Sequence, residues 1–107
     1  MKPDLEEYQE GLLWKLGEGQ GLTIGVTQST LDLAGAIQSL ELAEIGDEFD
    51  AGDWVGELQG KDNLVEIVAP CALRIVERNR EVEEQPALLE DDPTGDAWLL
   101  RAERLDG

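Results

Sequence analysis

Histidine is absent from this chain of 107 residues, and cysteine occurs once. Without histidine the chain cannot build a Ser-His-Asp or Cys-His nucleophile pair, and a typical catalytic zinc site is not expected. We therefore expect no catalytic residues, no metal site and no enzymatic activity of the chain's own. Cys71 cannot form an internal disulfide, which suits a reducing compartment.

Basic side chains are also scarce. Eight lysines and arginines face 25 acidic residues, so the formal net charge is −17 and the isoelectric point lies near 4.1. Nucleic acids and anionic membranes are bound through basic surfaces, and neither is expected as a partner. A basic protein is the better expectation, because opposite charge speeds association.

Long apolar runs are missing too, since no stretch approaches the roughly 20 residues that cross a bilayer. The first seven residues are too acidic for a secretory or mitochondrial presequence. Together with the unpaired cysteine, this predicts a cytoplasmic protein. Hydrophobic residues nevertheless make up 41% of the chain, enough for one core, and the length predicts a single domain over residues 1–107.

Short runs of alternating apolar and polar residues, separated by glycines, predict a mainly β protein. A hairpin is predicted at Gly60–Asn63, where turn-forming residues separate two such runs. We expect a short helix or turn at residues 30–36, capped by Ser29 or Thr30, and a short helix near Pro86, with Asn79 as a helix start or turn residue. The expected strands are Leu22–Thr27, Ile37–Leu42, Trp54–Gln59, Leu64–Ala69, Ala72–Glu77 and Trp98–Ala102.

This pattern predicts an antiparallel β-sandwich or flattened barrel with short peripheral helices. Leu31 and Leu33 of the first helix are available for burial. The expected interior residues of the sheets are Ile24, Val26, Leu40, Leu42, Val55, Leu58, Ile67 and Ile75.

Several side chains have a functional and a structural interpretation, and we favour the structural one. Asp91, Asp92 and Asp96 lack the ligand spacing of an EF-hand, so we expect a solvated acidic turn. Cys71 is expected to be a buried small hydrophobe, and Trp14, Trp54 and Trp98 to be core or rim anchors. Glu81, Glu83, Glu84 and Glu90 are expected on a solvated face that could also dock a basic partner.

Spaced motifs between Tyr8 and Leu99 resemble the H protein of the glycine cleavage system. Gly25-Val26-Thr27 resembles the family's Gly-Ile-Thr, and Asp92–Leu99 resembles its Asp-Pro-Tyr-Gly-Asp-Gly-Trp-Leu. No insertion or deletion separates Gly25 from Leu99 in this comparison. The resemblance implies the fold of lipoyl and biotinyl carriers and a non-enzymatic carrier whose lysine bears lipoate. It also implies three enzyme partners, namely a glycine decarboxylase, an aminomethyltransferase and dihydrolipoamide dehydrogenase.

The resemblance departs from the family at the modified residue. The family's lipoyl lysine lies six residues after the glycine matching Gly56 and eight before the proline matching Pro70, and Asp62 occupies that place here. Lys61 is one position early, where a side chain on a strand would point to the other face. We favour an H-protein-like interaction module without a cofactor, with Lys61 a solvated turn residue. The alternative is a carrier with lipoate on Lys61, attached by a lipoate ligase that docks, like the enzymes, on acidic surfaces.

Overall fold

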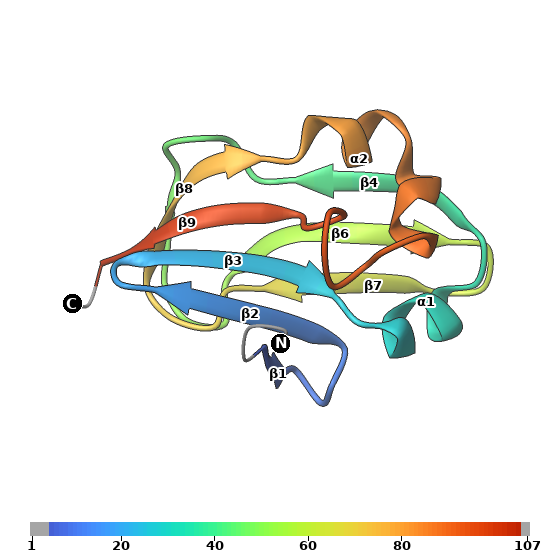
Figure 1. Ribbon diagram of the computed structural model, residues 1–107, viewed down its shortest axis with the longest axis horizontal. Coiled ribbons are helices and arrows are strands. Elements are labelled where there is room, and N and C mark those ends of the chain that lie inside the picture. The colour runs from blue at the N-terminus through green and yellow to red at the C-terminus, as the bar shows by residue number, and fades with distance from the viewer. Residues whose placement is uncertain (1–4, 106–107) are drawn as a thin grey trace.

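The computed structural model describes residues 5–105, which fold into two antiparallel sheets with short helices at one end (Figure 1). The larger sheet has the strand order β1-β2-β3-β9-β8-β5, and the smaller has the order β4-β6-β7. The strands are β1 (Glu6–Tyr8), β2 (Leu13–Glu18), β3 (Gly21–Val26), β4 (Ile37–Leu42), β5 (Glu48–Phe49), β6 (Trp54–Gly60), β7 (Leu64–Val68), β8 (Leu73–Arg78) and β9 (Leu100–Arg104). The helices are α1 (Gln28–Ala34), α2 (Arg80–Glu84) and the 3₁₀ helix η1 (Pro86–Glu90).

Alternating side chains form the core between the sheets. In β7, Val65 and Ile67 are buried while Leu64 and Glu66 are exposed, as the period of two in a strand requires. One buried cluster joins residues of both sheets, including Ile24 and Ile75 from the larger and Val55 and Leu58 from the smaller. The predicted antiparallel sandwich or flattened barrel is confirmed.

Seven of the eight predicted interior residues are buried, and the eighth is only half-buried. Leu40 is opposite Leu58 and packs against the core, but β4 is an edge strand and its ladder is irregular between Ile37 and Ser39. The edge position leaves part of Leu40 open to solvent. The buried seven are Ile24, Val26, Leu42, Val55, Leu58, Ile67 and Ile75.

Helix α1 begins two residues earlier than predicted, and neither expected cap serves it. Thr27 is the N-cap residue, and no side chain caps the helix. The hydroxyl of Thr27 donates to the carbonyl of Gly11 at 2.6 Å instead, and that of Thr30 donates to the carbonyl of Leu12. These contacts anchor α1 to the chain entering β2.

The burial expected of Leu33 is also wrong. Leu31 and Ala34 are three residues apart on one helical face and are buried, whereas Leu33 on another face is 45% exposed. Strand β9 begins at Leu100 rather than at Trp98, and Asn79 precedes α2 as its N-cap residue. No helix within residues 5–105 has both the length and the apolar character to span a bilayer.

The candidate site at the β6–β7 hairpin tip

The predicted hairpin joins β6 to β7 through a turn that places Lys61 and Asp62 side by side at its centre. Gln59 pairs with Leu64, and the Gly60 N–H donates to the Asn63 carbonyl at 2.9 Å. Neither central residue has a positive φ. Both side chains are exposed, so Lys61 presents a primary amine and Asp62 presents a carboxylate at the tip.

The tip is bound to the end of helix α1 by four hydrogen bonds. The N–H of Lys61 donates to the Ala36 carbonyl at 2.8 Å, and the N–H of Asp62 donates to the Ala34 carbonyl at 2.8 Å. The N–H of Asn63 also donates to Ala34, at 3.4 Å, while its side-chain amide donates to the Leu33 carbonyl at 2.8 Å. Because both central residues are held through their backbone, the tip has a defined position on α1.

Gly60 locks the register of this turn. A Cβ atom built on Gly60 would lie 2.1 Å from the Ala34 carbonyl oxygen, so only glycine fits there. Moving Lys61 into the place of Asp62 would move Gln59 into the place of Gly60 and create this clash. The ladder from Gly56–Ile67 to Gln59–Leu64 is also continuous. The hairpin therefore cannot slide by one residue without losing its contact with α1.

The carboxylate of Asp62 lies against the glycine that ends α1. A Cβ atom built on Gly35 would lie 2.6 Å from Asp62 Oδ2, and Gly35 has a φ of 78°. The carbonyls at a helix C-terminus carry partial negative charge, so an acidic side chain is electrostatically unfavourable there. Neither Asp62 nor Lys61 forms an ion pair within residues 5–105.

Two exposed leucines flank the tip. Leu33 is 45% exposed on α1, and Leu64 is 46% exposed at the start of β7. Neither the exposure of Leu33 nor the role of Ala34 was predictable from the sequence pattern. Gly60 was the signal for the close contact, but a glycine in a turn does not reveal which backbone atom approaches it.

The remaining candidate residues lie away from the tip and have structural contacts. Asp92 accepts the Asp96 N–H at 3.2 Å within the loop that precedes β9. Residues 5–105 contain no group of three cysteine, aspartate or glutamate side chains arranged to hold a metal ion. Cys71 is half-buried against the core rather than fully buried. Burial raises the pKa of the nearby Tyr8 hydroxyl, and the negative charge of a Cys71 thiolate raises it further.

The three tryptophans are anchors of the core and rim, as predicted. Trp14 is 2% exposed and its indole N–H donates to the Pro93 carbonyl at 2.9 Å. Trp54 is half-buried and donates to Glu57 at 3.2 Å. Trp98 is half-buried beneath Arg101, whose guanidinium carbon lies 4.1 Å from the ring centroid.

The predicted solvated acidic face needs one correction. Glu81, Glu84 and Glu90 are exposed, but Glu83 is half-buried and accepts two hydrogen bonds of 2.7 Å from Arg78. Its hydrogen bond and negative charge raise the pKa of Arg78 above its ordinary value, and the more distant Glu44 adds to this effect. The pair binds α2 to the end of β8.

Comparison with known proteins gives one family. Residues 6–106 match the model of the glycine cleavage H-protein family. The chain is 32% identical over 104 residues to the glycine cleavage system H protein of Staphylococcus haemolyticus, covering 97% of this chain and 82% of the relative. It is 34% identical over 105 residues to that of Pseudoalteromonas translucida, covering 97% and 81%.

A solved structure agrees in fold. The crystal structure of a glycine cleavage system H protein from Mycobacterium marinum superposes with a TM-score of 0.88, covering 98% of this chain and 87% of that one. Its sequence identity of 23% supports the fold alone. The family model and the two relatives carry the assignment, and this chain belongs to the glycine cleavage H-protein family.

Proposed function

We propose that this chain is an H-family protein without the standard lipoyl acceptor, and that it acts by binding other proteins. Asp62 stands where the resemblance places the family's modified lysine. A carboxylate cannot form the amide that joins lipoate to a lysine amine, so position 62 does not fit the cofactor. The observation that carries the proposal is the register lock, in which Gly60 and the Ala34 carbonyl keep Lys61 out of the place of Asp62.

The candidate partners follow from the family. We propose three enzyme partners: a glycine decarboxylase, an aminomethyltransferase and dihydrolipoamide dehydrogenase. A lipoate ligase is a further partner in the alternative in which Lys61 is lipoylated. The charge of −17 favours partners with basic surfaces and speeds their encounter. We place this binding role in the cytoplasm and assign no catalytic residue to the chain.

One observation favours a second candidate function, a carrier with lipoate on Lys61. Its side chain is exposed at the same turn as Asp62 and forms no ion pair within the described part of the chain, whereas the Lys15 amine lies 3.8 Å from Glu6. A mobile arm needs a free amine on a rigid support, and the anchored hairpin supplies that support. Against it, the amine lies one residue from the position that the resemblance assigns.

Intact-mass spectrometry after incubation with lipoate, ATP and a lipoate ligase tests both functions. We expect no addition to the natural protein and one lipoyl group on Asp62→Lys, with or without Lys61→Val. Lys15→Arg and Lys61→Arg are matched controls that keep the charge. One lipoyl group on the natural protein, lost in Lys61→Arg and kept in Lys15→Arg, would establish the carrier function instead.

A binding role requires a separate measurement. The unmodified protein should bind at least one of the three proposed enzymes in calorimetric titration. Absence of saturable binding to all three would contradict the proposed interaction role, whatever the mass measurement gives.

A further inference from the structure

Trp98 lies between two hollows in the surface, well separated in sequence from the hairpin tip. One hollow has a volume of about 580 Å³ and the other about 1020 Å³, and Trp98 lines both. Residues 60–63 line neither hollow. The surface that contains these two hollows, here called the Trp98 surface, is therefore separate from the candidate site at the tip.

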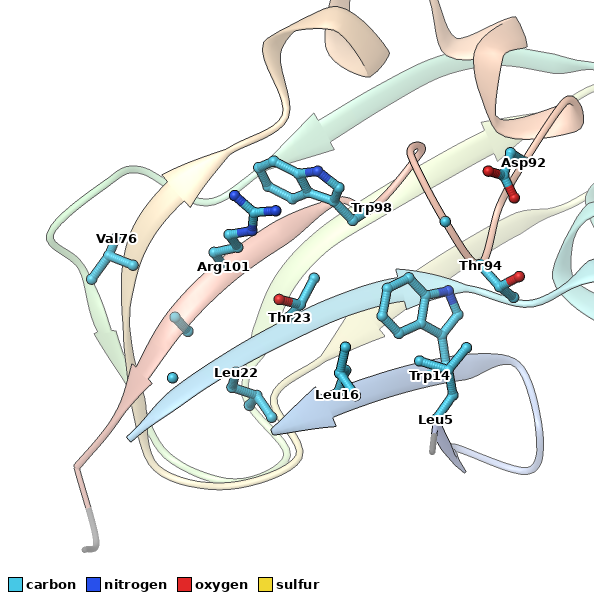
Figure 2. Close-up of a pocket in the computed structure, with 13 residues that line it drawn as sticks. Leu5, Trp14, Leu16, Leu22, Thr23, Val76, Asp92, Thr94, Trp98 and Arg101 are labelled. Atoms are coloured by element: carbon cyan, nitrogen blue, oxygen red, sulfur yellow. The ribbon is translucent and has the colours of Figure 1, made fainter. Parts of the chain in front are cut away.

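The smaller hollow is mainly apolar and lies on the outer face of the larger sheet. Trp14 pairs with Gly25, Leu16 with Thr23, and Thr23 with Arg101, so alternate positions of β2, β3 and β9 share this face, opposite the core. Figure 2 shows Thr23 between the two indole rings and Leu16 beside Trp14, with Val76 and Arg101 at one end and Thr94 at the other. Val76 is 44% exposed. The volume of the smaller hollow suits one large apolar side chain with adjoining backbone.

The larger hollow is polar and predominantly acidic. Its lining contains four carboxylates and two guanidinium groups. Two of the carboxylates already form ion pairs, Glu44 with Arg78 and Glu77 with Arg101. Ile45 adds an apolar side chain that is 62% exposed. The charged residues are Glu44, Glu77, Glu81 and Asp96 with Arg78 and Arg80.

The backbone of Trp98 is anchored where the hollows meet. The side-chain amide of Asn79 donates to the carbonyls of Asp96 at 3.1 Å and Trp98 at 2.8 Å, which fixes the backbone around the indole. Arg101 covers one ring face and its guanidinium donates to Glu77 at 3.3 Å. A partly exposed tryptophan whose position is fixed before binding loses little entropy on contact, which is typical of interface hot spots.

We propose that the Trp98 surface docks a basic segment of a partner protein, with a leucine-sized side chain in the apolar hollow and a neighbouring lysine or arginine in the acidic hollow. Charge complementarity selects this occupant. The net charge of −17 repels a second copy of the chain and any anionic partner, and it attracts a basic one. The surface contains two of the five large hydrophobic side chains that are exposed within residues 5–105, Ile45 and Val76.

The test is an NMR titration of the isotope-labelled full chain with the peptide Gly-Lys-Lys-Leu-Lys-Lys-Gly, capped at both ends. We expect saturable shifts of the Trp98 indole N–H and of the Thr23 and Arg101 amides, with the tip amides of Lys61 and Asp62 unmoved. Replacing the peptide's leucine by serine, or Trp98→Ala in the protein, should weaken binding about tenfold.

Two matched pairs of variants separate the proposed surface from general charge and apolarity. Val76→Ser and Leu64→Ser remove side chains of similar exposure, and Glu81→Gln and Glu66→Gln remove one exposed charge each. We expect Val76→Ser and Glu81→Gln to weaken binding about threefold and their counterparts to leave it nearly unchanged. Equal effects within each pair, shifts centred on the tip, or no saturation by about 5 mM peptide would overturn the proposal.

Discussion

The backbone N–H of Asp62 donates to the Ala34 carbonyl at 2.8 Å, which brings an acidic side chain to the C-terminal end of helix α1. The carboxylate then lies beside partial negative charge rather than away from it. A positively charged side chain at this position would have the opposite effect. We therefore expect the identity of residue 62 to affect the stability of the tip.

Asp62→Lys should raise the free energy of unfolding by about 0.5 to 1 kcal/mol, and Asp62→Asn by about half as much. Urea denaturation at low salt measures the difference. Glu66→Gln is the control, since it removes a charge from an exposed position on β7 outside the turn. A loss of stability in Asp62→Lys would mean that the carboxylate makes a favourable contact at the tip.

Gly60→Ala should destabilise the protein by about 2 to 4 kcal/mol, because its new Cβ atom would lie 2.1 Å from the Ala34 carbonyl oxygen. Gly17→Ala is the matched control, since the atoms its Cβ would meet belong to the guanidinium of Arg104, a flexible side chain that can move away. Thermal denaturation of both variants checks the difference. Equal melting temperatures would show that the tip can leave α1 at little cost, and the register lock would then fail.

The sequence predicted the hairpin well because its determinants are local. Val65 and Ile67 alternate with polar or exposed positions, and Gly60 and Asn63 are turn formers. The attachment of the tip to Ala34 was not predictable in this way, since that contact depends on where α1 packs in three dimensions. The family resemblance pointed to Asp62 as a residue of interest, but not to the contacts that hold it.

The first two strands were missed for a related reason. Tyr8 donates to the Val68 carbonyl at 2.9 Å and Gln9 to the Glu66 carbonyl at 2.7 Å, so contacts about sixty residues away help to position β1. The sequence between Glu6 and Glu18 is acidic, lacks a clean alternation and turns through Gly11, which has a φ of 82°. Tertiary contacts outweigh local propensity here.

Asn79→Ala should cost about 1 to 3 kcal/mol, because this buried amide satisfies the carbonyls of both Asp96 and Trp98. Asn63→Ala is a control of the same chemistry, since that exposed amide donates only to Leu33 and water can replace it. Urea denaturation should show the larger loss for Asn79→Ala. Similar losses would indicate that the loop before β9 does not depend on the Asn79 contacts.

Alkaline pH should destabilise the protein through Tyr8. Burial, with a contribution from Cys71, raises the pKa of Tyr8 above its ordinary value of 10.0, so the folded chain retains a proton that the unfolded chain releases. The resulting stability is fully present below pH 10.0 and is lost as the pH rises above it. Urea denaturation near pH 9 and near pH 11 should show a larger loss for the natural protein than for Tyr8→Phe.

An ultraviolet absorbance titration gives an independent measurement, because Tyr8 is the only tyrosine in the chain. Its ionisation should occur above pH 10.0 in the folded protein and near it in urea. Coincident titrations of the folded and unfolded chain would contradict the assigned effect of burial.

Moderate salt should raise the melting temperature at neutral pH. A net charge of −17 on a body of 37 × 32 × 25 Å is self-repelling, and 0.1 M salt limits the reach of that repulsion to about 10 Å. Three of the six ion pairs within residues 5–105 have both side chains exposed, Arg74 with Glu48 and Glu103 and Arg101 with Glu77, and exposed pairs contribute little. We expect a rise of about 4 °C between low salt and 0.15 M, equivalent to roughly 1 kcal/mol.

The control is the same scan near the isoelectric point of 4.1, where the repulsion is small and the rise should disappear. A flat or falling melting temperature at neutral pH would show instead that specific ion pairs outweigh the general repulsion.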